Sequence, residues 1–314
     1  MSARLRIGTR GSELALRQTR TIVGLLQRHA PGLVCDIIEI TTHGDRFQTT
    51  PIAQMGPQVE RGIFNTALEQ AVLRGEVDLA TCSFKDVESD LPPGLAAVSA
   101  GVREDPHDVL VSRHGLPLGE LPHGAVLATS SPRRVSQLAA FRSDFRFEPL
   151  RGNVTTRANS DRERYDGVIL AAAGLRRLDL GARITQVIPE DILLPAPAQG
   201  ALGCEFAQER SDVAQLVAAI QDPDTEQCVR LEKALLVRLS GGCFAPVGIL
   251  ATMREDRRVD IRCRIASLDG ARKVEDRIVG PRARGPELLA ELADRVIAAG
   301  GRDLVDEARK VLQG

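Results

Sequence analysis

The sequence predicts an α/β protein, because segments typical of buried strands alternate with segments of helical periodicity along most of the chain. From about Asp222 onward the order changes to a long helix, then strands, then a last helix. This change indicates a small α+β domain at the C-terminal end. At 314 residues the chain is long enough for two or three domains with cores of their own.

Strands that alternate with helices are typical of parallel sheets, in which a helix connects one strand to the next. We therefore expect largely parallel sheets. The predicted strands cover residues 5–8, 34–40, 77–80, 125–128 and 167–171.

Capping residues mark the helices between these strands. Ser12 is placed to cap a helix that follows the first strand. Residues 62–74 put apolar side chains on one helical face, and Gly75 is suited to end that helix. Pro132 suits the first position of another helix.

The C-terminal region combines a helix over residues 225–239 with a strand over 259–265 and a helix over about 286–299. The strand alternates strictly between apolar and polar residues, so we expect it to have one face in water. Between the first helix and the strands lies Gly241-Gly242-Cys243. Two glycines permit a tight loop that carries the thiol outward, although a cysteine in a loop is more often an inert small hydrophobe.

Stretches rich in glycine, proline or alanine near residues 101–106 and 195–201 would let the chain cross from one domain to a second and return. The predicted domains are residues 1–103 with 199–221, residues 104–198, and residues 222–314.

Composition excludes several classes of protein. The chain is 43% hydrophobic and 26% charged, as in ordinary soluble domains, and its formal charge of −1 argues against a globally basic nucleic-acid binder. Six cysteines without metal-type spacing, and an N-terminus without an apolar signal region, indicate a reduced cytoplasmic protein without a metal site or membrane span. We expect a monomer.

Basic and hydroxyl side chains gather where predicted strands lead into helices. Ligands of open α/β sheets bind at the carboxyl ends of strands, and arginine binds carboxylates through two parallel hydrogen bonds. The sequence therefore predicts an anion-binding cleft. These junctions hold Arg10 with Ser12, Lys85 with Asp86, Ser130 and Ser131 with Arg133 and Arg134, Arg151 with Arg157, and Arg176 with Arg177.

Asp86 is the one carboxylate among these cations. It is either a solvated ion-pair partner of Lys85 or a catalytic group that stabilises positive charge or moves a proton. The residues alone leave both roles open.

Ordered motifs across nearly the whole length resemble hydroxymethylbilane synthases, also called porphobilinogen deaminases. These motifs are RIGTRGS at 6–12, SFKDV at 83–87, REDP at 103–106, TSSPRR at 129–134, RGNV at 151–154, LLPA at 193–196, QGA at 199–201 and GGC at 241–243.

The resemblance implies two domains like type II periplasmic-binding proteins around a cleft, and a third domain that carries the cysteine. It also implies a dipyrromethane cofactor, held as a thioether on Cys243, onto which four porphobilinogen units are joined with loss of ammonia before water releases the tetrapyrrole. It places Asp86 and Lys85 in catalysis. By resemblance the further cofactor contacts are Lys85, Ser130, Arg133, Arg134, Arg151 and Gly152, and the substrate contacts are Arg10, Ser12, Arg157, Arg177 and Gln199.

The chain departs from the family pattern around the site. Cys82, Phe84 and Glu88 stand where the family usually has histidine, methionine and proline. We expect residues 54–62 to form a mobile lid, in which Gln54 replaces a lysine. Two other activities therefore stay open: a paralogue that makes a different or shorter pyrrole oligomer, and a non-catalytic carboxylate binder, which would require neither Asp86 nor Cys243.

Overall fold

The structure is a computed structural model of the chain. It describes residues 4–42, 65–88, 90–160, 164–240 and 245–313. No helix within these ranges is both long and apolar enough to cross a membrane.

The chain divides into two compact units. The first is Met1–Glu104 with Gly200–Glu226, and the second is Asp105–Gln199 with Gln227–Gly314. The chain thus leaves the first unit after residue 104 and returns at residue 200. The C-terminal residues belong to the second unit, and the division into three domains stays a prediction.

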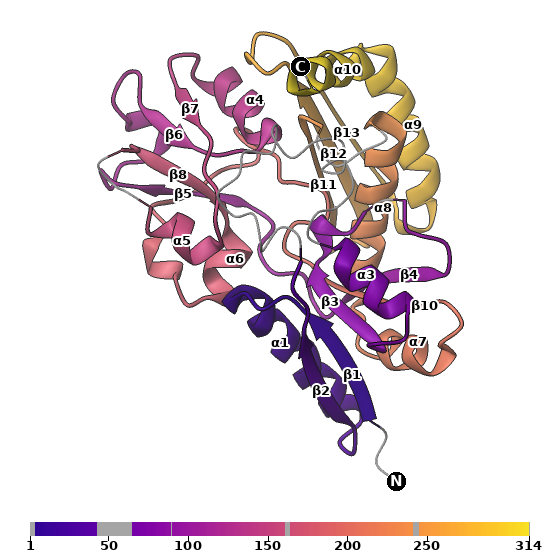
Figure 1. Cartoon of the computed structure of the whole chain (residues 1–314). Coiled ribbons are helices and arrows are strands. Elements are labelled where there is room, and N and C mark those ends of the chain that lie inside the picture. The colour runs from indigo at the N-terminus through magenta and orange to yellow at the C-terminus, as the bar shows by residue number, and fades with distance from the viewer. Residues whose placement is uncertain (1–3, 43–64, 89, 161–163, 241–244, 314) are drawn as a thin grey trace. The chain divides into compact units, whose positions relative to one another are not determined.

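A five-stranded sheet forms the centre of the first unit in its described part, with strand order β2-β1-β3-β10-β4 (Figure 1). The strands β1, β2 and β3 run parallel, and β10 is antiparallel to both of its neighbours. The elements of this unit are β1 (Arg4–Thr9), α1 (Glu13–His29), β2 (Val34–Glu39), α3 (Thr66–Leu73), β3 (Leu79–Ser83), η3 (Phe84–Asp86), β4 (Leu95–Ala100), β10 (Leu202–Ala207) and α7 (Ser211–Ala218).

Helices cover both faces of this sheet. On one face Ile22 of α1 and Val213 of α7 pack into the core that contains Leu79 and Cys204. On the other face Leu68 of α3 packs into a second core. The central strands β3 and β10 are accordingly buried along nearly their whole length.

The second unit contains another five-stranded sheet, with order β7-β6-β8-β5-β9. Here β6, β7 and β8 are parallel and β5 is antiparallel to its neighbours, so both sheets have the same topology. The elements are β5 (Asp108–Ser112), η4 (Leu118–Glu120), β6 (Val126–Ala128), α4 (Pro132–Phe141), β7 (Arg146–Glu148), α5 (Val154–Ala158), β8 (Gly167–Ala171), α6 (Ala172–Arg177), η5 (Gly181–Arg183) and β9 (Gln186–Val187).

The second sheet is also covered on both faces, by α4 on one side and by α5 and α6 on the other. Two such sheets are the α/β fold predicted for two domains of the type II periplasmic-binding-protein class. The prediction of largely parallel strands is confirmed for three strands in each sheet. One strand of each sheet, β10 in the first and β5 in the second, runs antiparallel to its neighbours.

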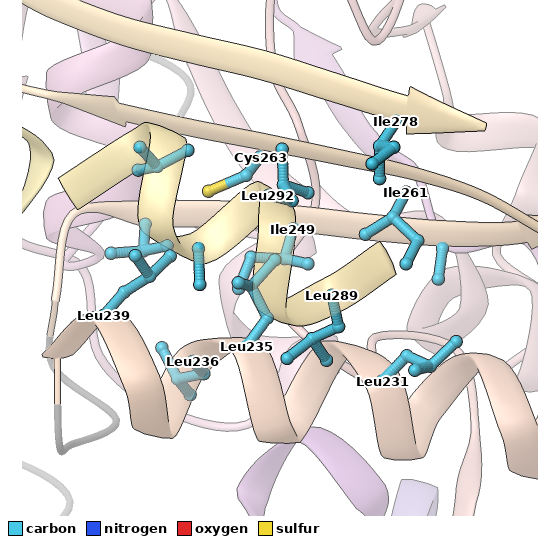
Figure 2. Close-up of a cluster of buried hydrophobic side chains, with 14 of the residues drawn as sticks. Leu231, Leu235, Leu236, Leu239, Ile249, Ile261, Cys263, Ile278, Leu289 and Leu292 are labelled. Atoms are coloured by element: carbon cyan, nitrogen blue, oxygen red, sulfur yellow. The ribbon is translucent and has the colours of Figure 1, made fainter. Parts of the chain in front are cut away.

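A three-stranded antiparallel sheet completes the chain, with order β11-β12-β13. Together with its helices it is the predicted small α+β domain. Figure 2 shows its core, in which Leu235 of α8, Ile249 of β11 and Leu292 of α9 meet. The elements are α8 (Pro223–Ser240), β11 (Val247–Met253), β12 (Arg258–Ala266), β13 (Lys273–Pro281), η6 (Arg282–Arg284), α9 (Gly285–Ala298) and α10 (Gly301–Gln313).

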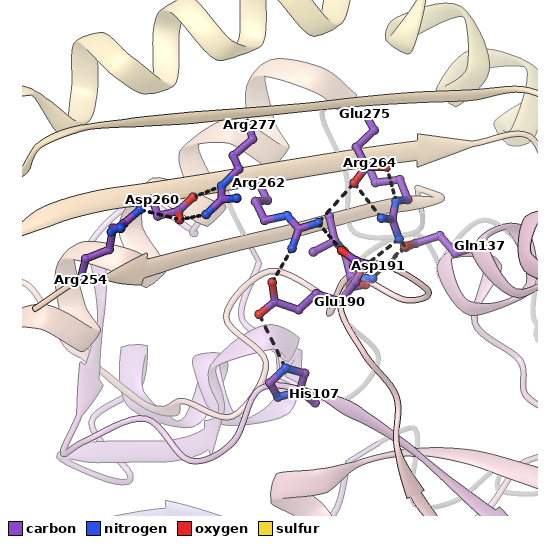
Figure 3. A network of polar contacts seen from close by, with 11 residues as sticks. His107, Gln137, Glu190, Asp191, Arg254, Asp260, Arg262, Arg264, Glu275 and Arg277 are labelled. Atoms are coloured by element: carbon purple, nitrogen blue, oxygen red, sulfur yellow. Dashed lines mark hydrogen bonds and ion pairs between the residues drawn. The ribbon is translucent and has the colours of Figure 1, made fainter. Parts of the chain in front are cut away.

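The expectation that β12 has one face in water is wrong. Asp260 and Arg264 are 7% and 3% exposed, and Arg262 is half-buried. Their charges are covered by partners from neighbouring segments (Figure 3). The alternating pattern therefore marks an apolar face and a charged buried face.

Candidate active site

Two predicted junctions lie at the same edge of the first sheet. β1 and β3 are adjacent and parallel, so Arg10, which follows β1, and Lys85 and Asp86, which follow β3 in η3, come from neighbouring carboxyl ends. Gln18 of α1 donates a hydrogen bond from Nε2 to Ser83 Oγ at 2.9 Å, which ties the helix after β1 to the end of β3. The structure thus brings these predicted residues to one edge.

Ser12 starts α1 as predicted. Its Oγ accepts a hydrogen bond from the backbone N–H of Ala15 at 3.3 Å, the usual N-cap contact. The hydroxyl is therefore oriented by the helix, and the residue remains half-buried.

Two of the three unusual residues around the lysine–aspartate pair are buried and Glu88 is half-buried, whereas Asp86 is exposed. Cys82 and Phe84 are 7% and 5% exposed. Asn65 donates from Nδ2 to Cys82 Sγ at 3.7 Å, and Gly203 leaves room for Phe84, since a Cβ there would lie 3.0 Å from the ring. These two departures are accommodated in the protein interior, and the carboxylate of Asp86 remains accessible.

A second group of predicted residues lies at the carboxyl edge of the second sheet. β6 lies between β7 and β8 and all three are parallel, so the segments that follow them are neighbours. Ser130 Oγ bonds both to the carbonyl and to the N–H of Leu150, at 3.1 and 3.0 Å, immediately before Arg151. Gly152 has φ +106°, a conformation that disfavours any side chain.

Arg133 and Arg134 are buried in the first turn of α4, at 4% and 7% exposed. Both pair with the carboxylate of Asp108: Arg133 Nη1 lies 2.7 Å from Oδ2, and Arg134 Nη2 lies 2.6 Å from Oδ1. Burial alone would raise the pKa of Asp108, but the charges of the two guanidiniums hold it well below its usual range. This carboxylate is therefore ionised under ordinary conditions.

Gln199 is 1% exposed and bonds to the same group. Its Nε2 donates to Asp108 Oδ1 at 3.1 Å and to the carbonyl of Pro106 at 2.8 Å. The sequence predicted Gln199 as a substrate contact; the structure places it against the carboxylate that holds the arginines.

Arg176 and Arg177 do not lie at a strand-to-helix junction, and this part of the prediction is wrong. Both occupy the last turn of α6, because that helix begins directly at the end of β8. Arg176 pairs with Asp105 at 2.8 Å, while Arg177 is half-buried. Arg157 likewise lies in the last turn of its short helix, α5.

We expect Arg134→Leu to abolish cofactor assembly. Removal of one guanidinium from a desolvated charge pair costs about 2–5 kcal/mol and removes a predicted ligand contact. Intact mass of the folded protein, produced in cells that make porphobilinogen, measures this. Arg302→Leu is the control, because Arg302 is exposed and donates to the carbonyl of Arg238 on the surface. If every chain of the Arg134 variant carried the covalent cofactor, the prediction of an anion-binding cleft would be contradicted.

His107 bridges two carboxylates beside the segment that enters the second unit. Its Nδ1 lies 2.5 Å from Asp105, and its Nε2 lies 3.6 Å from Glu190. Glu190 in turn pairs with Arg262 of β12 at 2.6 Å (Figure 3). The neighbouring carboxylates of Glu190 and Asp105 raise the pKa of His107 to about 9.

A raised pKa makes the stability of this unit depend on pH. Because the pKa of His107 is about 9 in the folded protein and about 6.5 unfolded, its contribution is complete below about pH 6.5 and is lost as the pH rises through 9. We expect the advantage in unfolding free energy of the wild type over His107→Gln to shrink by on the order of 2 kcal/mol between pH 6 and pH 9.5. Denaturant unfolding of both proteins at the two pH values measures this difference in unfolding free energy. The same difference at both pH values would contradict the prediction.

Cys243 and the predicted lid at residues 54–62 lie outside the described residues. The structure does describe α8, the helix that precedes Cys243. Four of the other cysteines have thiols whose pKa lies above its ordinary value. Burial raises the pKa of each of these four, which makes them weak nucleophiles. They are Cys35, Cys82, Cys204 and Cys263.

Sequence reasoning missed Asp108 and Glu232. Glu232 is fully buried on α8 and accepts hydrogen bonds from the N–H groups of Ala198 and Ala251, at 2.5 and 2.7 Å. Each stands next to apolar residues in the sequence, Asp108 before Val109-Leu110-Val111 and Glu232 after Leu231. A carboxylate in such a setting is a signal for a buried partner.

Two α/β sheets of one topology, with arginines and hydroxyl groups at the carboxyl edges of their parallel strands, are typical of proteins that bind anionic ligands. Residues 5–215 match the family model described as "Porphobilinogen deaminase, dipyromethane cofactor binding domain", and residues 226–295 match its C-terminal domain. The chain belongs to the porphobilinogen deaminase family.

Curated relatives agree over nearly the full length. The porphobilinogen deaminase of Desulfitobacterium hafniense is 40% identical over 98% of this chain and 99% of its own. That of Moorella thermoacetica is 42% identical over 97% of this chain and 96% of its own. Among solved structures, the BenM effector-binding domain with benzoate covers 70% of this chain and 91% of its own at a TM-score of 0.40 and 14% identity, a likeness too weak to bear on function.

Proposed function

We propose that the chain is a hydroxymethylbilane synthase: it joins four porphobilinogen units head to tail with loss of ammonia on a covalent dipyrromethane primer, and water then releases the linear tetrapyrrole. The family match over both parts of the chain carries this proposal. The presence of Asp86 and Cys243 at the positions that the family resemblance assigns to catalysis and cofactor attachment supports it.

The residues of the second unit fit a dipyrromethane, whose two rings carry four carboxylates. Five arginines predicted as its contacts or as substrate contacts belong to this unit, and guanidinium is suited to bidentate carboxylate binding. The primer, when bound, supplies the nucleophilic pyrrole carbon to which units are added. The arginines in question are Arg133, Arg134, Arg151, Arg157 and Arg177.

The role proposed for Asp86 follows from the charge that porphobilinogen develops. When the C–N bond of its protonated aminomethyl group breaks, the electron pair leaves with neutral ammonia and the methylene carbon becomes cationic, with the charge shared over the pyrrole. A carboxylate beside the ring N–H stabilises this cation and the transition state that leads to it. Asp86 is exposed at the carboxyl end of β3, where a substrate can reach it.

Arg10, Ser12 and Lys85 supply the opposite chemistry. Each porphobilinogen carries an acetate and a propionate, and the growing chain accumulates both. Cationic and hydroxyl groups at the edge of the first sheet would bind these carboxylates and orient the ring toward Asp86. We propose them as substrate contacts, with Lys85 also facing the primer.

Incubation with porphobilinogen as the sole substrate tests the function. We expect a linear tetrapyrrole by mass spectrometry, with ammonia released for each unit added. A product that stops at fewer rings would support the shorter-product paralogue. Absence of any product from protein that binds pyrrole carboxylates would support a binding protein and overturn the proposal.

We further propose that the protein acts in the cytoplasm as a monomer in tetrapyrrole biosynthesis, without a nucleic-acid or membrane partner. The five cysteines in the described ranges are free thiols, as a reducing compartment would keep them. The formal charge of −1 gives no general attraction to nucleic acid. Size-exclusion chromatography with light scattering tests the monomer.

A further inference from the structure

Asp108, the first residue of β5, has no exposed surface and four hydrogen-bond donors on its carboxylate. Arg133 Nη1 donates to Oδ2, while Arg134 Nε and Nη2 and Gln199 Nε2 donate to Oδ1, at distances between 2.6 and 3.1 Å. The two oxygens of one buried carboxylate thus accept hydrogen bonds from both guanidiniums and from the side-chain amide of Gln199.

The position of the two arginines on α4 is unfavourable without such a carboxylate. Both lie in the first turn, where the helix dipole disfavours positive charge. Consecutive helical residues also point about 100° apart, since a turn has about 3.6 residues. Asp108 offsets the charge and draws both side chains to one point.

Backbone carbonyls complete the orientation of each guanidinium. Arg133 Nη1 also donates to the carbonyl of Leu194 at 2.6 Å, and Arg134 Nη1 donates to the carbonyl of Ile169 at 2.8 Å. The orientation of each planar guanidinium is therefore fixed, because rotation of either group would break a charged hydrogen bond in a buried site.

The buried group is not neutral. Two guanidiniums face one carboxylate, which leaves one positive charge in excess in a setting where charge is costly unless it is compensated. A carboxylate from a ligand is the chemical partner that this excess favours. Asp108 thus both holds the two cations and leaves them able to attract an anion.

We propose that Asp108 is a positioning residue, which fixes the guanidiniums of Arg133 and Arg134 in the orientation that receives the carboxylates of the pyrrole primer. This proposal rests on the proposed function. Asp108 itself acts through the arginines.

Covalent loading of apoprotein tests the proposal without relying on turnover. Protein produced in cells that make no porphobilinogen is mixed with porphobilinogen, and intact mass follows the appearance of the loaded chain. We expect Asp108→Asn to load at least about tenfold more slowly, a difference of about 1.4 kcal/mol, because the amide presents a donor to one guanidinium. Its half-saturating porphobilinogen concentration should rise as well.

Asp144→Asn is the matched control. Asp144 forms a bidentate pair with Arg142 in the same unit, at 2.7 and 3.0 Å, away from the predicted contacts. This variant should lose thermal stability but load at the wild-type rate. If Asp108 only supported the fold, both variants would lose stability and load normally once folded, and that result would overturn the proposal.

A second variant keeps the test decisive if Asp108→Asn does not fold. Asp108→Glu retains the charge but moves the carboxylate by one methylene, so positioning predicts slower loading even though the charge is kept. Wild-type loading by Asp108→Glu would overturn the proposal. Failure of the wild type itself to load would instead contradict the proposed function, so the two outcomes are distinguishable.

Discussion

Asp86→Asn is expected to lower turnover by about a hundredfold or more, the scale seen when a preorganised electrostatic group is removed from an active site. Asparagine keeps the shape of the side chain but cannot offset a developing positive charge. Asp86 is exposed at the end of η3, so the substitution should leave thermal stability nearly unchanged. Initial rates with porphobilinogen, together with a melting curve, measure both effects.

Asp90→Asn is the control for this prediction. Asp90 is exposed a few residues further along the same segment and has no predicted role, so its loss should be silent. Near-normal turnover of the Asp86 variant would return that residue to the role of an ion-pair partner of Lys85. A large loss of stability would mean that its carboxylate supports the fold.

Local signals in the sequence predicted much of the fold. β8 occupies residues 167–171 as predicted, and Pro132 begins α4. Gly75 follows α3 with φ +67°, the conformation that ends helices. Periodicity and capping act over a few neighbouring residues, and such features can be recognised without knowledge of the tertiary structure.

Features that depend on distant partners were not predictable. Arg262 of β12 pairs with Glu190, which lies in a different domain of the predicted division, so the charged face of β12 read as exposed. The helix predicted over about 286–299 ends before the pair Gly300-Gly301, and α10, which follows this pair, was not predicted. A Cβ at Gly301 would lie 2.7 Å from Val296, so the glycine permits a tight turn between two packed helices.

The candidate site shows the same division. Arg10, Arg133 and Arg151 were recognisable because ligands of open α/β sheets bind at the carboxyl ends of strands, and the structure brings these residues to two sheet edges. Asp108 was missed because its partners follow 25, 26 and 91 residues later. The apolar run that follows Asp108 indicates a buried carboxylate, but a single sequence does not show which distant groups pair with it.

Cys243→Ser is expected to abolish covalent loading completely, since a serine hydroxyl cannot replace a thiolate as the nucleophile that forms the thioether. Wild-type protein from cells that make porphobilinogen should carry the mass of two linked pyrrole rings, and the variant should have the mass of the bare chain. The packing of α8 into the core, in the segment that precedes Cys243, implies that the variant still folds.

Cys204→Ser and Cys228→Ser are the controls, because both cysteines are buried, at 0% and 5% exposed, and Cys228 lies on α8 itself. Burial raises the pKa of the Cys204 thiol, so it holds little thiolate at neutral pH. Both controls should load fully, even if the buried hydroxyl lowers their melting temperature. If loading persists in Cys243→Ser but is lost in one of the controls, the attachment site is that other cysteine. If well-folded wild-type protein has only the mass of the bare chain, the proposal of a covalent primer is wrong.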